Sequence, residues 1–465
     1  MKRRIWGKVT GILLCGALLL GAAGCSADPD AGGAPAAKED GAQAENAGGA
    51  AGTQAQDGAG EAAKRQGAPS TGVVLEVATT RTSEQADALQ KLMDGFTAQT
   101  GIGVEVVAPG DEYEPLLKTR MASNDLPDLF ETHGWSTTRY RPSLMALDEQ
   151  PWVADILDDT RQTVTAADGH IYTLPLSIDP ACICYNKEIL EQAGVDVSKM
   201  RTWADFEAAC EKIKALGVTP INGGVSTSTI AANIFEVIAP GFLTNEDAAD
   251  NQTAALQGGS FDWDKYWTPI SELVAGWAEK GYFNPDILTS SEDSSVQALA
   301  TGEAAFVIRG PQTINEALLY NPDARLGLLP NLTPEAGRKV YVSSGEGTCF
   351  GVWKDTEYPE EALQLCEYLA QPENCSKIAT IFAQIPAMQG VSNEDAYVTK
   401  AYNEMRETFG DDVIFIQYFD RGYLPNGMWN DMSVAATEIL LNPQDGVKKS
   451  VEILKKGYED KFGVE

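Results

Sequence analysis

Residues 73–107 read VVLEVATTRTSEQADALQKLMDGFTAQTGIGVEVV, and they contain two strand patterns around one helix pattern. The first six residues are rich in β-branched side chains and predict a strand. From Ala88 to Phe96 the apolar residues recur at helical spacing, which predicts an amphipathic helix. Gly101 and Gly103 follow that helix and stop it, and residues 104–107 predict a second strand. This order predicts one unit of an α/β fold.

The same alternation continues along the chain. The sequence predicts a helix at 113–122, strands at 128–130 and 172–175, and helices at 187–193 and 203–216. Such alternation indicates a sheet rich in parallel strands. In sheets of this kind ligands bind in the crevice beyond the carboxyl ends of the strands, so a binding site is expected there.

Composition and charge exclude one large class of partners. The 465 residues include 35 Lys and Arg against 67 Asp and Glu, which gives a net charge of −32. Binding to nucleic acid needs clustered basic residues, and no such cluster occurs in the sequence. A hydrophobic fraction of 43% is enough for sizeable cores, in two or three domains or one large two-lobed body. Residues 1–72 hold seven basic and seven acidic residues, so residues 73–465 carry the whole net charge.

The N-terminus has the pattern of an export signal. Three basic residues precede a short apolar run, and small residues lead to Cys25, so residues 1–24 are predicted to be a signal peptide. Residues 22–25 resemble the lipobox of bacterial lipoproteins, in which the cysteine is lipidated; an ordinary signal peptide with an incidental cysteine is the alternative. Of the 47 residues from 26 to 72, 25 are Ala or Gly, so residues 25–72 are predicted to be a lipidated cysteine and a flexible tether.

The six cysteines that follow Cys25 do not form a disulfide scaffold. Six cysteines in nearly 400 residues leave two possibilities open, free buried thiols or at least one disulfide. With only His133 and His170, and no Cys-x-x-Cys pair, the sequence predicts no metal site and no cofactor. The six are Cys182, Cys184, Cys210, Cys349, Cys366 and Cys375.

Six short motifs occur in an order that is typical of one family. They are FTAQTGIGV at 96–104, LPDLF at 126–130, GHIYTLP at 169–175, YNK at 185–187, TWADF at 202–206 and GEAAF at 302–306. Together they resemble the extracellular solute-binding proteins of bacterial ABC importers, specifically the sugar-binding family of maltose-binding protein. The resemblance covers residues 73–465.

This resemblance implies an α/β, two-lobed fold of the periplasmic-binding-protein type II class, with a ligand cleft between the lobes. The lobes are expected to be discontinuous. Residues 73–180 and 346–392 are assigned to lobe 1, and residues 181–345 and 393–465 to lobe 2. Gly345 and Gly347 precede an apolar strand and are expected to act as a hinge.

Several charged residues lie near the expected crossings between lobes. Asp179 comes just before the apolar strand predicted at 181–185, and the matching acidic position of the family binds sugar hydroxyls; a structural role at the crossing is the alternative. Glu346 is a second candidate ligand, with a solvated hinge carboxylate as its alternative. Arg81 follows the first strand and is a candidate for the rim of the site.

Aromatic side chains stack on the C–H faces of sugars, so they are the next candidates. Trp135 lies among polar residues after the strand at 128–130, and Trp429 matches a stretch where the family often has a stacking aromatic, with Tyr423 nearby. Packing is the alternative role for each. The remaining tryptophans with apolar neighbours are predicted to lie in the core: Trp203, Trp263, Trp267 and Trp277.

At Gly310-Pro311-Gln312 the chain departs from the family, which commonly has Gly-x-Trp there with the Trp as a sugar platform. Gln312 can hydrogen-bond hydroxyls but offers no stacking face, and Arg309 can clamp a carboxylate or a pair of hydroxyls. This difference favours a smaller or more polar glycan, an acidic one included, over a long maltodextrin.

The resemblance therefore implies a monomeric substrate-binding lipoprotein on the outer face of the membrane, most consistent with a Gram-positive-type cell. It would capture a carbohydrate by lobe closure, deliver it to the transmembrane subunits of an ABC permease, and have no catalytic residue. Alternatives on the same fold are a non-sugar solute, such as a polyamine or peptide, and presentation of a ligand to a sensor kinase. A secreted glycoside hydrolase would need a paired acid and nucleophile, for which the sequence has no local signature.

Overall fold

The computed structural model describes residues 71–81, 83–132, 137, 139–166, 168–226, 231–382, 384–391, 393 and 396–463. The predicted signal peptide, Cys25, nearly all of the tether and Trp135 lie outside these residues. No described helix is both long enough and apolar enough to cross a membrane. The described residues also contain no group of His, Cys, Asp and Glu side chains that could hold a metal ion.

The first sheet contains the predicted strand–helix–strand unit. Its strand order is β2-β1-β3-β11-β4, and β1 pairs in parallel with both β2 and β3. Helix α1 (Ser83–Thr100) connects β1 to β2, and its apolar face packs with α13 (Pro359–Ala370) and α14 (Pro372–Ile381) in one hydrophobic core. The unit predicted at 73–107 is therefore confirmed. The strands are β1 (Val74–Ala78), β2 (Gly103–Val107), β3 (Leu129–Glu131), β4 (Thr173–Pro175) and β11 (Cys349–Val352).

The second sheet has the order β7-β8-β6-β9 and a separate, larger core. Trp203, Trp263, Trp267 and Trp277 are at most 4% exposed in this core, as predicted. The strands are β6 (Ile183–Asn186), β7 (Thr219–Ile221), β8 (Ala304–Ile308) and β9 (Leu326–Leu329). The helices around them are α5 (Lys187–Gln192), α6 (Trp203–Ala215), α7 (Ala232–Leu243), α8 (Thr253–Gln257), α9 (Trp263–Tyr266), α10 (Thr268–Glu279), α11 (Glu292–Thr301), α12 (Gln312–Tyr320), α15 (Tyr397–Phe409), α16 (Phe419–Tyr423), α17 (Met428–Leu441) and α18 (Pro443–Lys461).

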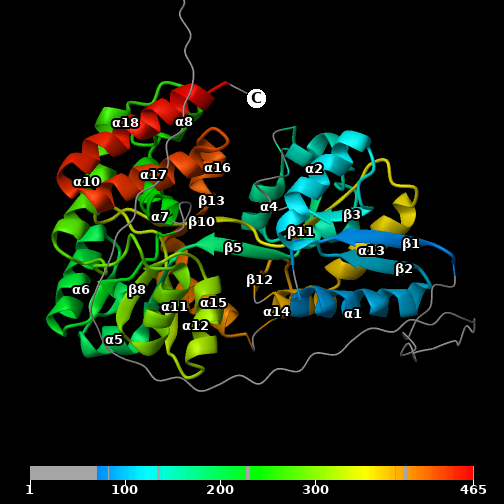
Figure 1. Ribbon diagram of the computed structural model, residues 1–465, viewed down its shortest axis with the longest axis horizontal. Helices are drawn as coiled ribbons and strands as arrows, with labels where there is room; N and C mark the ends of the chain where they lie inside the picture. The colour runs from blue at the N-terminus through cyan, green and yellow to red at the C-terminus, as the bar shows by residue number, and fades with distance from the viewer. Residues whose placement is uncertain are drawn as a thin grey trace, which may run out of the picture. The chain divides into compact units, whose positions relative to one another are not determined.

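A third sheet connects these two groups of elements (Figure 1). Its order is β12-β5-β10-β13, where β5 (Ser177–Ala181) leads from β4 to β6 and β10 (Val340–Glu346) leads from β9 to β11. Strand β13 (Val413–Gln417) pairs in parallel with β10, and β12 (Ile385–Pro386) pairs antiparallel with β5. Helix α4 (Asp158–Val164) packs against β10 and β13, while α2 (Tyr113–Ser123) belongs to the first group. The chain thus passes between the two cores on paired strands.

One predicted boundary was wrong. The sequence places Asp179 before a strand at 181–185, but the structure has Asp179 inside β5, which ends at Ala181, with β6 starting at Ile183. The reason is that β5 pairs antiparallel with β10, so that Asp179 lies opposite Gly345. Backbone pairing with a distant strand therefore extends the strand across the polar residue.

All six cysteines within the described residues are buried and unpaired, so the free-thiol alternative holds for them.

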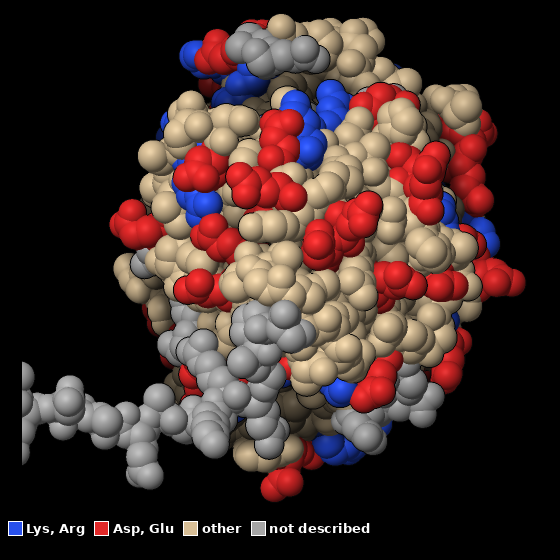
Figure 2. Space-filling view, turned by 90° about the vertical axis from the view of Figure 1, so that its right-hand side faces the viewer, with Lys and Arg blue, Asp and Glu red and all other residues tan. Residues whose placement is uncertain are grey.

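The surface carries the acidic excess. Figure 2 shows acidic side chains scattered among uncharged ones over the face at the β1 and β2 end, where they outnumber the basic ones.

Candidate functional site

A buried carboxylate fixes the loop after β1. Glu131 is fully buried at the end of β3 and accepts hydrogen bonds from the Thr79 hydroxyl (2.7 Å), from the Thr80 amide and hydroxyl (both 3.0 Å) and from Arg81 Nη2 (3.2 Å). The parallel pairing of β1 and β3 brings these residues together, because both strands end at the same edge of the sheet. Glu131 was missed from the sequence, although its position directly after a predicted strand was the available signal.

Arg81 is held in place from three sides. Besides Glu131, its Nη2 donates to the Thr348 hydroxyl at 2.9 Å, and its guanidinium carbon lies 4.5 Å from the ring centre of Phe382. Its Nε is buried and has no hydrogen-bond partner in the described part of the chain. The guanidinium is therefore fixed and still has a donor to offer.

Thr348 belongs to a hydrogen-bonded group at the start of β5. Its hydroxyl and that of Ser177 both donate to Gln384 Oε1, at 2.7 and 2.6 Å, and the Thr348 amide donates to Ser177 Oγ at 2.7 Å. A Cβ on Gly347 would lie 2.8 Å from Gln384 Nε2 and from Ser177 Oγ. A side chain at 347 would therefore have to displace these hydrogen-bonded groups.

Asp179 lies at the middle of β5 and is partly exposed. Burial raises the pKa of its carboxyl, and the positive charge of Arg421 acts in the opposite direction. The hydroxyl of Tyr418 donates to the Asp179 main-chain oxygen. Opposite Asp179, a Cβ on Gly345 would overlap the Tyr418 ring, so this glycine is required for close packing.

Glu346 is the last residue of β10 and is only 5% exposed. Burial raises the pKa of its carboxyl to about 7, and its own backbone, Arg421 and Thr163 stabilise the ionised form in part. A carboxyl with this pKa exchanges its proton near neutral pH. Asp179 and Glu346 thus place two carboxyls on adjacent connecting strands.

A further buried carboxyl, that of Glu236, supports the turn that follows β13. Glu236 of α7 accepts from the amides of Phe419 (2.6 Å) and Asp420 (3.1 Å). Burial and the neighbouring Asp420 raise the pKa of Glu236 to about 8. These bonds fix residues 418–421 relative to the connecting strands. Sequence reasoning missed this turn and its residues Tyr418 and Arg421, since only an apolar strand pattern before it was available.

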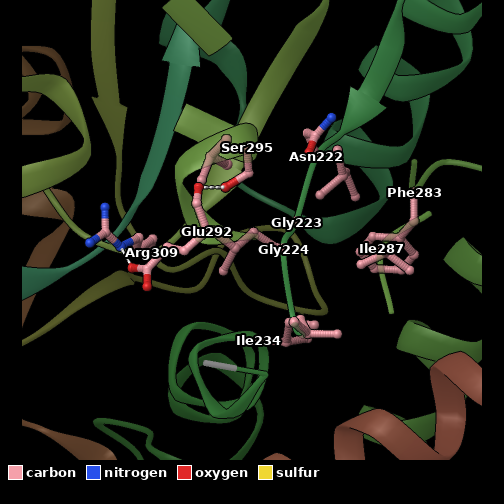
Figure 3. A pocket seen from close by; sticks show the side chains of 13 residues that line it. Asn222, Gly223, Gly224, Ile234, Phe283, Ile287, Glu292, Ser295 and Arg309 are labelled. Atoms are coloured by element: carbon pink, nitrogen blue, oxygen red, sulfur yellow. Dashed lines mark hydrogen bonds and ion pairs between the residues drawn. The ribbon is translucent and has the colours of Figure 1, made fainter. Parts of the chain in front are cut away.

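Arg309 lines a cavity beyond β7 and β8, and its positive charge favours the ionised form of Asp179 less strongly than that of Arg421 does. Figure 3 shows its side chain beside Glu292 at the cavity wall, and Glu316 binds it from α12, so that two carboxylates occupy its guanidinium. The cavity is also lined by Asn222 and Phe283 and encloses about 20 Å³, which is room for one or two water molecules and not for a sugar ring.

Gln312 is the first residue of α12, and its Oε1 is buried without a hydrogen-bond partner among the described residues. An unpaired buried amide oxygen is costly and can accept from a ligand hydroxyl. Tyr423 and Trp429 are partly buried and pack against the larger core; the Tyr423 ring lies 5.6 Å from that of Phe419. The structure therefore places Arg81, Asp179 and Glu346 at or beside the connecting strands, with Asp179 opposite Gly345 and Glu346 opposite Ile178. Tyr423 ends α16 and Trp429 lies in α17.

Comparison with known proteins gives the family. Residues 82–374, more than half of the chain, match the family described as bacterial extracellular solute-binding protein. The chain is 29% identical over 375 residues to the melibiose/raffinose/stachyose-binding protein MelE of Bacillus subtilis, covering 79% of this chain and 85% of that protein.

Two solved structures extend the likeness to the fold. A sugar transporter of Bacillus licheniformis in complex with stachyose is 30% identical, with a TM-score of 0.69, over 83% of this chain and all of that one. A binding protein of Bacillus subtilis in an open conformation is 27% identical, with a TM-score of 0.74, over 83% of this chain and 97% of that one. The predicted family and two-lobed α/β fold are confirmed, and the chain belongs to the bacterial extracellular solute-binding proteins.

Proposed function

We propose that this protein is the substrate-binding component of an ABC importer and that it captures an oligosaccharide of the melibiose, raffinose and stachyose class. The observation that carries the proposal is the likeness to a stachyose-bound sugar transporter along that protein's whole length. The relative MelE, whose name includes all three sugars, supports the same class. The carboxyls, hydroxyls and guanidinium groups at the connecting strands fit the hydroxyls of a neutral saccharide.

The proposed contacts follow from this placement. Arg81, Asp179 and Glu346 bind hydroxyls at the connecting strands, and Gln312 accepts from a further hydroxyl. The aromatic candidates Trp135, Trp429 and Tyr423 supply stacking faces, and Arg309 acts through the carboxylates that hold it. The lobes close by rotating about the connecting strands, with Gly345 and Gly347 as hinge residues. No bond in the sugar is made or broken.

The membrane link is proposed from the sequence. Cys25 carries the lipid after residues 1–24 are removed, and the Ala- and Gly-rich tether lets the monomer reach the transmembrane subunits of the permease from outside the cell. Replacing Cys25 with Ser should release the protein into the medium and abolish incorporation of labelled palmitate. Retention of the label in that variant would contradict lipidation at Cys25.

A solute screen tests the ligand class. The purified protein is titrated with melibiose, raffinose, stachyose and maltotriose, and with spermidine and a tripeptide as non-sugar solutes. The galactosides should raise the unfolding temperature in a concentration-dependent way, because a ligand of the folded state stabilises it. Stabilisation by spermidine or the peptide alone would overturn the proposal, as would release of free sugar at enzyme-like rates.

A further inference from the structure

Tyr418 is fixed against the two connecting strands by its ring, its hydroxyl and its amide. Its ring occupies the space that a Cβ on Gly345 would need, its hydroxyl donates to the main-chain oxygen of Asp179, and its amide donates to Ser344 O at 3.1 Å. The parallel pairing of β10 with β13 brings it there, since Gln417 lies opposite Ser344. The aromatic ring therefore has little freedom to move relative to β5 and β10.

Arg421 lies over the ring of Tyr418. Its guanidinium carbon is 4.2 Å from the ring centre of Tyr418, a distance at which the cation is attracted to the aromatic face. Its ion pair within the described residues is with Asp420, where Nε lies 3.8 Å from Oδ1. No hydrogen bond from its terminal nitrogens to a described residue is found, and about a third of the side chain is exposed. The guanidinium is thus restrained and keeps free N–H donors.

The acceptors next to this guanidinium are carboxyls. A Cβ on Gly345, the residue that pairs with Asp179 across β5 and β10, would lie 3.5 Å from Arg421 Nη1, and the positive charge of Arg421 favours the ionised forms of Asp179 and Glu346. A planar fork of N–H donors beside a partly exposed carboxylate matches two adjacent hydroxyls of a sugar ring, one accepting and one donating. Because Tyr418 already restrains the side chain, less entropy is lost when a ligand binds.

We propose that Arg421, held on the ring of Tyr418, is a ligand-contacting residue that donates to one sugar hydroxyl while Asp179 accepts from its neighbour. This inference rests on the proposed carbohydrate-binding function and adds a specificity-determining pair to it. The pair selects a ring with two adjacent hydroxyls in the right orientation. If a sugar lacks one of these hydroxyls, either Arg421 or Asp179 is covered by the ligand without a hydrogen-bond partner, and that sugar binds more weakly.

The test measures raffinose affinity by calorimetry for the wild type, Arg421→Gln and Tyr418→Phe. Arg421→Gln should weaken binding at least tenfold, and Tyr418→Phe, which keeps the ring but loses the bond to β5, should weaken it about threefold. The matched control is Arg406→Gln, because the Arg406 guanidinium also lies over aromatic rings, 5.2 Å from that of Phe415. That control should bind within twofold of the wild type.

Raffinose derivatives that lack single galactosyl hydroxyls distinguish contact from a merely structural role. Wild type should lose affinity for the derivative without the contacted hydroxyl, and Arg421→Gln should bind this derivative and raffinose equally. If the wild type binds raffinose and Arg421→Gln binds it equally well, the inference is wrong and the proposed function stands. If the wild type binds no galactoside, both are wrong. Should Arg421→Gln fail to fold by circular dichroism, Arg421→Lys is used with the same derivatives, and unchanged discrimination there would overturn the inference.

Discussion

Glu346→Gln should make the ligand-free protein more stable at alkaline pH. The Glu346 carboxyl is buried at the end of β10, and burial raises its pKa from 4.5 to about 7. The folded state therefore binds the proton more tightly than the unfolded state does. Stability from this group is fully present below pH 4.5, falls as the pH rises towards 7, and is lost above it.

The size of the effect follows from the shift. A shift from 4.5 to about 7 corresponds to a loss of about 3 kcal/mol once the carboxyl is ionised. Glutamine has nearly the same shape and no charge to bury, so the variant avoids this loss. We expect Glu346→Gln to exceed the wild type by about 2 to 3 kcal/mol at pH 8, and by less than about 1 kcal/mol at pH 5.

The assay is urea unfolding followed by tryptophan fluorescence at pH 5, 6, 7 and 8, without ligand. Glu149→Gln is the control, because Glu149 is exposed and its substitution should leave the pH profile unchanged. The reasoning is refuted if wild type and Glu346→Gln lose stability in parallel between pH 5 and pH 8. A parallel loss would mean that Glu346 is solvated in the ligand-free protein.

Three further changes test the packing and the stacking faces. Gly345→Ala should destabilise the protein by about 1 to 3 kcal/mol in urea unfolding, because the added methyl group meets the ring of Tyr418. The control is Gly276→Ala, which adds a methyl group in an open part of α10 and should be neutral or stabilising by the same measurement. Glu131→Gln should cost about 2 to 3 kcal/mol in the same assay, since a fully buried acceptor of several hydrogen bonds loses its charge beside Arg81. Trp429→Ala should weaken raffinose binding by about 1 to 3 kcal/mol in calorimetry, and an unchanged affinity would remove Trp429 from the site.

Local patterns predicted the parts of the fold that depend on neighbours in the sequence. The strand–helix–strand unit at 73–107 and the buried tryptophans could be found because period and composition decide them. The extent of β5 could not, since its residues pair with β10 more than 150 residues later. Strand pairing over such distances overrides the local preference of Asp179 for a loop.

The site residues likewise fall into those that the sequence alone could suggest and those that depend on long-range pairing. Asp179, Glu346 and Arg81 could be proposed because polar residues stand out beside predicted strands. Tyr418 could not, because its role depends on the register between β10 and β13 and on the missing side chain at Gly345. Arg309 is the converse case. The sequence shows a guanidinium beside a glycine turn, but only the fold brings carboxylates from α11 and α12 to it.

The pairing of the arginines bears on the charge of the ligand. An acidic glycan needs a positive group that is not already neutralised, yet each arginine near the site has a carboxylate within ion-pair distance. Asp179 and Glu346 add two carboxyls that have no ion pair within 4.0 Å among the described residues. An anionic sugar ring bound beside them would therefore be repelled by like charge where little water screens it. The expectation of a smaller, more polar glycan therefore narrows to a neutral one. A galacturonate oligosaccharide should bind at least tenfold more weakly than raffinose at pH 8, with the difference shrinking as the pH falls below 7 and Glu346 takes up its proton. The arginine pairs concerned are Arg81 with Glu131, Arg309 with Glu292 and Glu316, and Arg421 with Asp420.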